Sequence, residues 1–476
     1  MQKNETHEIE IDGMTSEGQG VGRVDGFVVF VDGALPGEKV LTHIVKSTSS
    51  YAIGKIIDIM RPANTRRDAF CAAYERCGGC ALQHMDYAAT LDYKTGVVKD
   101  AIQRIAGLSA QETDEKVLPT IGMESPFNYR NKAQYPVGKD RTGATVSGFY
   151  AKRTHEIVPH ENCAIQDATS GRVRERVMAF MARHPRELTP YDEHTGRGLI
   201  RHIMTRVGFA TGDVMVVLVI TTKQLPYAEE LVADLVREIP NLKSVFLNIN
   251  TSRTNLILGR TCIKLHGDDR IFDEILFEKP SDNAAEDFAN KNAALRFRIS
   301  PLSFFQVNPV QTQVLYSTAI ELAALNGSET VNDLYCGTGT IGLFAARNAK
   351  HVIGIESVPE AIADARANAL ANGISNIEFH VGLAEEFLEG GVSGDDKNSD
   401  NVVFLDPPRK GCEPKLLESL VHLNPARIVY VSCNPATLAR DLKILLAQNF
   451  QLVTVRPVDM FPWGSHVEVV TLLTRV

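Results

Sequence analysis

The 476-residue chain lacks the features that mark membrane, secreted and disulfide-bonded proteins. It has no run of about 18 apolar residues, which argues against a membrane-spanning helix. Residues 1–11 are polar and contain no apolar stretch of the signal-peptide kind. Eight cysteines are too few for a disulfide scaffold in so long a chain. We therefore expect a cytoplasmic protein without a membrane partner.

Positive charge is also scarce. The formal net charge of -8 argues against a nucleic-acid partner, because phosphate binding needs local positive potential. Basic residues nevertheless recur between positions 130 and 206, where they are candidates for phosphate contact or else part of an ordinary solvated surface. These candidates are Arg130, Lys132, Arg141, Lys152, Arg153, Arg197, Arg201, His202 and Arg206. Their distribution leaves RNA binding open.

The length predicts two or three domains, since a typical domain has about 100 to 200 residues. Short strand patterns in residues 1–62 predict an OB-type β-barrel. Residues 63–290 are expected to form a central α+β domain, with a helix near 88–110 that we expect to pack on the C-terminal domain. Residues 291–476 alternate strand and helix, which predicts an α/β, Rossmann-like doubly wound sheet.

Three further segments are interpreted as irregular. The glycine-rich stretch 18–22 lies among strands with no helix after it, so we expect a turn there and no phosphate loop. Residues 282–292 form a polar connector. Residues 385–400 are acidic and rich in Gly, Ser and Asp, which favours a surface loop.

Three cysteines, Cys71, Cys77 and Cys80, are crowded into ten positions, with a glycine pair between the last two. In a reducing compartment this spacing indicates a metal site that lacks its fourth ligand. Zinc is one alternative, because His84 follows closely and could complete such a site. Cys163 is the other candidate, and four thiolates suit an iron-sulfur cluster.

In the C-terminal part, the predicted strands end on residues with reactive or polar groups. The segment 335–339 follows the first strand, Glu356 ends the second, Asp406 the fourth and Cys433 the fifth. Because the carboxyl ends of parallel strands meet at one edge of a sheet, these residues are expected to converge on one crevice. Gly337 and Gly339 would let a ligand approach the backbone. Glu356 would accept hydrogen bonds from ribose hydroxyls, although the glycine pattern also admits a dinucleotide.

Cys433 stands where a buried-strand pattern runs into a helix. Asn434 can cap that helix and Pro435 fits its first turn, so the helix dipole would favour the Cys433 thiolate. The alternative is an inert small residue at a strand end. Cys336 and Cys412 lack this strand-to-helix placement, and we expect both to be structural.

Five motifs, in this order, resemble those of the RNA (uracil-5-)-methyltransferase family: Ser303–Asn308, Asp333–Gly339, Asp406–Gly411, Ser432–Pro435 and His466–Glu468. Residues 1–62 resemble a TRAM domain. With the cysteine cluster, the chain is similar from end to end to the bacterial 23S rRNA branch of that family. One departure is Pro462–Ser465, where the family usually has a threonine, and the role of this loop stays open.

The resemblance implies an enzyme that methylates carbon 5 of a uridine in 23S rRNA, with S-adenosylmethionine as methyl donor. Cys433 would add to carbon 6 of a flipped-out base, and Glu468 would remove the carbon 5 proton. Contacts to S-adenosylmethionine are expected from Gln306, Tyr335, Gly337, Gly339, Glu356 and Asp406. A 4Fe-4S cluster is expected on Cys71, Cys77, Cys80 and Cys163.

The sequence indicates no obligate protein partner, and we expect a monomer. Three alternatives stay open. The first is the same reaction on the T-loop of tRNA. The second is an iron-sulfur redox or radical enzyme, although the cysteine spacing of five then two residues differs from the radical motif of three then two. The third is a non-catalytic RNA-binding protein.

Overall fold

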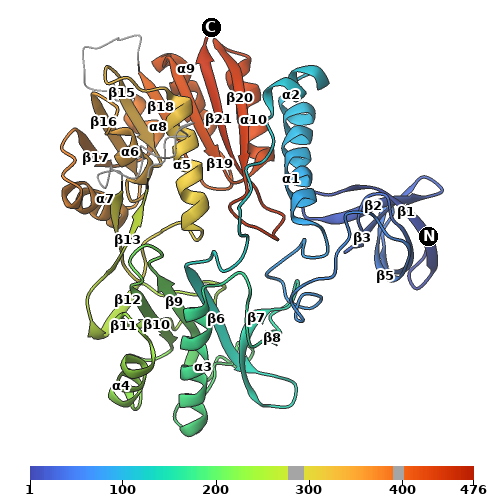
Figure 1. Cartoon of the computed structure of the whole chain (residues 1–476), viewed down its shortest axis with the longest axis vertical. Coiled ribbons are helices and arrows are strands. Elements are labelled where there is room, and N and C mark those ends of the chain that lie inside the picture. The colour runs from blue at the N-terminus through green and yellow to red at the C-terminus, as the bar shows by residue number, and fades with distance from the viewer. Residues whose placement is uncertain (277–293, 390–400) are drawn as a thin grey trace.

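The computed structural model describes residues 1–276, 294–389 and 401–476. A small N-terminal barrel, a central sheet and a larger C-terminal sheet make up the molecule (Figure 1). The C-terminal sheet lies above the central sheet in this view, and helix α1 runs beside it although α1 belongs to the first quarter of the sequence. Within the described ranges, no helix is both long and apolar enough to cross a membrane.

The N-terminal barrel is confirmed. Its five strands close in the order β1-β2-β3-β5-β4 around a core that includes Ile9, Val29 and Ile44. The strands are β1 (Thr6–Met14), β2 (Gln19–Val24), β3 (Phe27–Asp32), β4 (Lys39–Ser47) and β5 (Tyr51–Arg61).

The interpretation of residues 18–22 as a turn was wrong for most of that stretch, because β2 begins at Gln19. The turn lies just before it, where the amide of Gly18 donates to the carbonyl of Thr15. A Cβ on Gly22 would stand 2.4 Å from the Glu10 carbonyl oxygen, and one on Gly20 would stand 2.8 Å from that of Ala34. These glycines therefore allow close approach of the neighbouring backbone inside the barrel.

The helical segment after the cysteine motif packs on the C-terminal sheet. It consists of α1 (Tyr87–Ala101), a π-helical turn η1 (Ile102–Ala106) that ends at Gly107 with φ of +89°, and α2 (Ala110–Lys116). Val98 and Ile102 share a buried apolar cluster with Leu438 of the C-terminal region.

After α2, the chain runs along the edge of the C-terminal sheet. The amides of Leu118 and Ile121 donate to the carbonyls of Val455 and Pro457. Residues 87–121 are therefore part of the C-terminal core.

The central sheet has seven strands in the order β12-β11-β10-β9-β6-β7-β8. They are β6 (Lys132–Lys139), β7 (Thr145–Tyr150), β8 (Ile157–Pro159), β9 (Ile200–Val207), β10 (Val214–Ile220), β11 (Leu242–Ile249) and β12 (Thr261–Gly267). Helices α3 (Ala168–Arg183) and α4 (Ala228–Glu238) pack on this sheet. Every residue of β9 and β10 is buried, as expected for central strands that are covered on both faces.

An antiparallel pair, β13 (Ile271–Ile275) and β14 (Leu295–Ile299), leads from the central sheet to the C-terminal one. Its apolar residues join the cluster that contains Met215 of β10 and Val331 of β15, so the two regions share a core. The connector predicted at 282–292 and the domain limit predicted at 290/291 fall outside the described residues. The domain limits stay a prediction.

The C-terminal region is confirmed as a Rossmann-like doubly wound sheet, with the order β17-β16-β15-β18-β19-β21-β20. The first five of these strands are parallel, and β21 and β20 close the sheet antiparallel. The strands are β15 (Thr330–Leu334), β16 (His351–Glu356), β17 (Ile377–Val381), β18 (Val402–Leu405), β19 (Arg427–Ser432), β20 (Phe450–Val458) and β21 (Glu468–Arg475). The helices are α5 (Pro309–Ala323), α6 (Thr340–Ala345), α7 (Pro359–Ala371), α8 (Ala384–Glu389), α9 (Pro414–Leu423) and α10 (Pro435–Leu446).

The surface loop expected at 385–400 was wrong at its start, where residues 384–389 form α8. Ala384 is buried and Phe387 and Leu388 pack against the same apolar cluster, which explains a helix there despite the acidic sequence. Residues 390–400 lie outside the described part of the chain.

Candidate active site

The predicted strand-end residues lie at one edge of the C-terminal sheet. Leu334 of β15 pairs with Ile355 on one side and with Leu405 on the other, so Tyr335, Glu356 and Asp406 come next on three adjacent strands. The order of strands reverses between β15 and β18, and ligands of doubly wound sheets bind at such a switch point.

Cys433 and Glu468 are brought together by an antiparallel pairing. Ser432, the last residue of β19, is in register with Val469 of β21, so the next positions on the two strands are Cys433 and Glu468. Glu468 is buried and Cys433 is partly exposed. Burial raises the pKa of the Cys433 thiol, and Glu468 adds to this rise, as expected for acidic groups that face one another.

The expectation of a favoured thiolate at Cys433 was wrong. Asn434 does cap α10, since its side chain accepts from the amide of Ala436 at 3.0 Å. Burial nevertheless raises the thiol pKa to about 11, with further contributions from Glu468 and Asp406. Loss of solvation and two acidic neighbours therefore outweigh the helix dipole.

The two acids of this group also hold their protons more tightly than usual. Burial raises the pKa of Glu468 to about 8, and Asp406 adds to this shift. Burial alone raises the pKa of Asp406 to about 7. Arg409 opposes the shifts of both Glu468 and Cys433, because its positive charge favours their ionised forms.

Arg409 lies inside the Asp406–Gly411 motif, but sequence reasoning assigns it no role. Its loop is attached to the start of α10, because its carbonyl oxygen accepts hydrogen bonds from the Asn434 side chain at 3.2 Å and the Thr437 hydroxyl at 3.3 Å. Asn434 and Thr437, at the start of the helix after Cys433, therefore also hold the backbone of Arg409, whose charge opposes the rise in the Cys433 pKa.

Tyr316 of α5 is a second residue that sequence reasoning missed. It is buried, its hydroxyl hydrogen-bonds with the Gln306 side chain, and its pKa is raised by burial and then by Asp406 and Glu468. Gln306 is held from the other side, since its carbonyl accepts from the Asn131 side chain at 2.9 Å. No motif distinguishes Tyr316, which is one apolar-face residue in a helix.

The segment after β15 has room and polar groups for a ligand. Gly337 has φ of +55°, and a Cβ placed on it would meet no atom within 4 Å. Gly339 has φ of +81°, and a Cβ there would lie 2.8 Å from the Phe379 ring. Glycine is thus needed at 339 for packing, and 337 faces open space.

Two carboxylates stand beside this glycine segment. One oxygen of Asp333 accepts from the amide of Gly342 at 2.8 Å, and the other is buried with no hydrogen-bond partner among the described residues. Burial raises the pKa of Asp333 to about 8. The Glu356 carboxylate accepts from the Ser357 hydroxyl at 3.0 Å and the Val358 amide at 2.9 Å. These groups fit a nucleoside with hydroxyl and amino donors.

The two rival thiols lie inside the fold. Cys336 is 7% exposed and Cys412 is 3% exposed. The Cys412 thiol donates to the Tyr430 hydroxyl at 3.4 Å, and that hydroxyl donates to Asp441 at 2.8 Å. Both positions agree with the expected structural role.

The four predicted cluster cysteines line one pocket, beside Tyr74, Gln83 and Ile165. Burial raises the pKa of Cys77, Cys80 and Cys163, and mutual repulsion of the thiolates adds to it. His84, the alternative ligand, is absent from the lining and its Nδ1 lies 2.5 Å from the Tyr74 hydroxyl. In the described ranges, no group of three or more His, Cys, Asp or Glu side chains is arranged to hold a metal ion.

Three of the basic candidates for phosphate contact proved to be internal. Arg201 donates to the carbonyls of Asn250 and Ser252, Arg206 donates to that of Ser303, and His202 is also buried. That part of the prediction was wrong, because Arg201 and Arg206 satisfy backbone carbonyls inside the fold and His202 is buried. Arg141, Lys152, Arg153 and Arg197 are exposed.

Comparisons with known proteins decide the family. Residues 273–476 match the family model described as tRNA (uracil-5-)-methyltransferase, and residues 2–57 match the TRAM domain. An RNA methyltransferase of Caldanaerobacter subterraneus is 45% identical, over 99% of this chain and 98% of the relative. The chain belongs to the tRNA (uracil-5-)-methyltransferase family.

Other members cover the chain equally well. An RNA methyltransferase of Clostridium tetani is 42% identical over 100% of this chain and 97% of its own length. Among solved structures, the Pyrococcus abyssi tRNA (uracil-54, C5)-methyltransferase in complex with S-adenosyl-L-homocysteine has a TM-score of 0.75. It is 26% identical, and the match covers 98% of this chain and 100% of that one. The family and the TRAM domain agree with the resemblance seen in the motifs.

Proposed function

We propose that this protein transfers a methyl group from S-adenosylmethionine to carbon 5 of a uridine in 23S rRNA through a covalent adduct with Cys433. The observation that carries the proposal is the adjacency of Cys433 and Glu468 at the ends of two paired strands, beside Asp406 and Arg409. A nucleophile and a base on one edge of the sheet are what carbon 5 methylation of uracil requires.

The glycine segment and its neighbours would hold the cofactor. Gly337 leaves open space, Glu356 would accept from ribose hydroxyls, and the free oxygen of Asp333 would accept a further hydrogen bond. Tyr335, Gly339, Asp406 and Gln306 complete the proposed set. When bound, S-adenosylmethionine supplies an electrophilic methyl group.

The proposed chemistry begins with Cys433. Its sulfur adds to carbon 6 of the uracil, the carbon 5–carbon 6 double bond opens, and the electron pair moves into an enolate. Carbon 5 then takes the methyl group from the donor's sulfonium, and the methyl–sulfur bond breaks with its electron pair left on sulfur, which gives S-adenosylhomocysteine. Glu468 removes the remaining proton from carbon 5, the double bond re-forms, and the bond between carbon 6 and the Cys433 sulfur breaks. Protein and 5-methyluridine are released with electrons and protons in balance.

Proton placement sets a condition on this sequence. With a pKa of about 11, Cys433 is a thiol and not a thiolate at pH 7. The thiol must therefore lose its proton as the substrates bind. Glu468, whose pKa is about 8, must also be ionised before it can take the carbon 5 proton. Arg409 is the side chain of the described site whose charge favours the thiolate.

The target uridine has to leave its stack to reach Cys433, at a cost of a few kcal/mol. The TRAM domain and the exposed basic residues of the central region are proposed to supply contacts that offset this cost. We further propose that Cys71, Cys77, Cys80 and Cys163 hold a 4Fe-4S cluster, since the four thiols line one pocket and four thiolates are a known ligand set for it.

A tRNA substrate is the second candidate. It is favoured by the Pyrococcus abyssi relative, which is described as a tRNA methyltransferase and matches over the full chain. The resemblance of the motifs and of the cysteine spacing to the 23S rRNA branch is what supports rRNA as the first candidate.

Methyl transfer from labelled S-adenosylmethionine onto purified 23S rRNA and, separately, onto total tRNA tests the proposal. Both RNAs should come from a strain without this gene, so that the target position is unmethylated. We expect labelled 5-methyluridine in 23S rRNA and none with the Cys433→Ala variant. The Cys412→Ala variant serves as a control that should retain transfer. Label only in tRNA would replace rRNA as substrate, and full activity of Cys433→Ala would overturn the covalent mechanism.

A further inference from the structure

The loop between β20 and β21, residues 459–467, connects the proposed base to distant parts of the chain. Its ends are the paired residues Val458 and Glu468, so Glu468 is the first residue after the loop. The loop contains Trp463, which is the single tryptophan of the sequence and part of the departure from the family pattern. Trp463 has φ of +65°, a conformation that a bulky side chain adopts only when its surroundings impose it.

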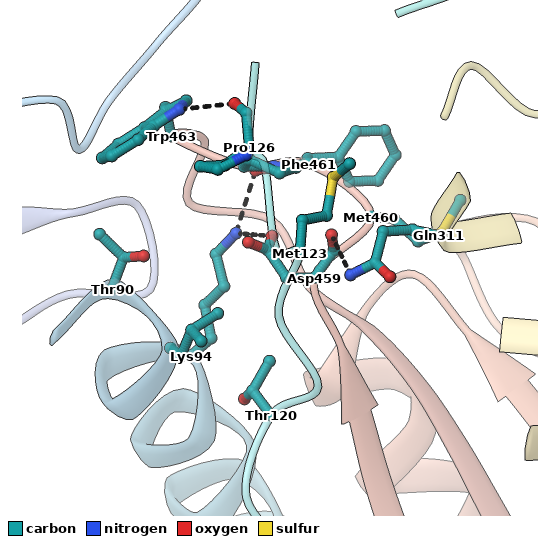
Figure 2. A network of polar contacts seen from close by, with 12 residues as sticks. Thr90, Lys94, Thr120, Met123, Pro126, Gln311, Asp459, Met460, Phe461 and Trp463 are labelled. Carbon is teal, nitrogen blue, oxygen red and sulfur yellow. Dashed lines mark hydrogen bonds and ion pairs between the residues drawn. The ribbon is translucent and has the colours of Figure 1, made fainter. Parts of the chain in front are cut away.

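The indole and the backbone carbonyl of Trp463 are both hydrogen-bonded to other segments. The indole Nε1 donates to the Pro126 carbonyl at 2.8 Å (Figure 2). The Trp463 carbonyl accepts from the amides of Ala81 and Leu82 at 2.8 and 2.9 Å. The residues that follow Cys80 are thus joined directly to the loop that leads to Glu468.

The indole ring is buried at this junction. Trp463 is 6% exposed and shares an apolar cluster with Tyr129 and Ile165. Phe70 and Phe127 lie with their ring centroids 5.1 and 5.7 Å from it. Aromatic packing of this kind holds the ring in one orientation.

The start of the loop is fixed from the opposite side by α1. Lys94 points from the helix toward the loop, where its Nζ lies 2.5 Å from Asp459 Oδ1 and 3.0 Å from the Phe461 carbonyl oxygen (Figure 2). The Tyr129 hydroxyl donates to the Pro462 carbonyl at 3.0 Å. Asp459, Phe461, Pro462 and Trp463 are therefore all held by residues outside the C-terminal sheet.

We propose that Trp463 is a positioning residue for Glu468: by fixing the loop against the cysteine segment and residue 126, it sets the place of the carboxylate that removes the carbon 5 proton. This inference depends on the proposed function. Trp463→Ala removes the indole hydrogen bond to Pro126 and the ring packing but keeps the backbone bonds to Ala81 and Leu82. Gly464 follows directly, so the segment that leads to Glu468 would gain freedom once the indole contacts are lost. Misplacement of a catalytic group by about 1 Å can cost a factor of roughly 10² in rate.

The step at which Glu468 acts allows a test that separates adduct formation from adduct breakdown. Glu468 acts after the Cys433 adduct has formed, so a displaced carboxylate slows breakdown of the adduct and leaves its formation nearly unchanged. We expect Trp463→Ala to form adduct with ordinary RNA within about twofold of the wild-type rate. Its breakdown should be about 10 to 100 times slower. The adduct should accumulate as a methylated protein–RNA band on a denaturing gel.

Three variants accompany this one. Glu468→Gln should accumulate the same band, as the direct loss of the base. Trp463→Phe retains an aromatic ring without the Nε1–H donor, and we expect an intermediate rate of breakdown. It also keeps the test open if Trp463→Ala does not fold. Phe180→Leu, in the core of the central region, is the matched control for a lost aromatic contact elsewhere, and its adduct should not accumulate.

A Trp463 variant in which formation and breakdown fall together, or neither falls, would overturn the positioning role. A different result would refute the proposed function itself. RNA that contains 5-fluorouridine traps the adduct without any need for the base, so a wild-type protein that forms no adduct with it would refute the covalent mechanism itself.

Discussion

The buried ion pair between Lys94 and Asp459 allows a sharp test of how α1 is joined to the C-terminal region. Both side chains are fully buried. Burial lowers the pKa of Lys94, and Asp459 opposes that shift. Removal of one partner from a buried pair leaves an uncompensated charge, which typically costs about 3 to 5 kcal/mol.

We expect Lys94→Met to cost about 3 kcal/mol, the lower end of that range. The reason is that Asp459 keeps the hydrogen bond that the Tyr87 hydroxyl donates to its other oxygen at 2.8 Å. Asp459→Asn should cost a similar amount, since it leaves the lysine charge buried. The double variant should also cost about 3 kcal/mol and not about 6, because an asparagine can still accept from Tyr87 and no charge is left unpaired.

Urea unfolding followed by tryptophan emission measures these differences, since Trp463 lies in the loop that the pair holds. Lys99→Met is the matched control. It makes the same substitution on the same helix, but Lys99 pairs with the largely exposed Asp114 at 2.6 Å. That surface pair should contribute at most about 1 kcal/mol. If the losses in unfolding free energy of the two single variants sum to that of the double variant within about 0.5 kcal/mol, the coupling between Lys94 and Asp459 is refuted.

Three further predictions concern the site. Burial raises the pKa of Glu468 from 4.5 to about 8, so the folded state keeps a proton that the unfolded state has lost. Stability should therefore fall as the pH rises from about 4.5 to 8, and Glu468→Gln should flatten this slope in unfolding experiments at pH 5.5 and 8.5. Gly339→Ala should weaken S-adenosylmethionine binding at least about tenfold in calorimetry, because its Cβ would meet the Phe379 ring. Cys80→Ser should lower the iron content of anaerobically purified protein and shift Trp463 emission, because the next two amides bond to Trp463; an unchanged spectrum would contradict that link.

The sheet edge that carries the candidate site residues could be predicted from the sequence, because a general rule of parallel sheets applies to it. The carboxyl ends of parallel strands meet at one edge of the sheet. The strand patterns alone therefore predicted that Tyr335, Glu356 and Asp406 lie at this edge. The pairing of Cys433 with Glu468 follows from the antiparallel closing strand, whose register no local pattern specifies. Gly20 and Gly22 suggested a turn, because closely spaced glycines occur both in tight turns and where the backbones of barrel strands pack closely.

What sequence reasoning missed depends on contacts between distant segments. Trp463 meets the residues after Cys80 and the carbonyl of Pro126, and neither partner is recognisable from the loop itself. Arg206 looked like a phosphate contact because burial of a charged residue has no local signature. The high pKa of Cys433 has the same origin, since burial and the acidic neighbours act from other strands, whereas the helix cap that favours the thiolate is visible in the sequence.

The central claim is that Cys433 bonds covalently to the target uracil. The most direct measurement is peptide mass spectrometry after wild-type protein reacts with S-adenosylmethionine and 23S rRNA in which uridine is replaced by 5-fluorouridine. We predict a single modified peptide whose nucleotide adduct is on Cys433 and carries the transferred methyl group. An adduct on Cys336 or Cys412, or methylated RNA released without any adduct, would contradict the account.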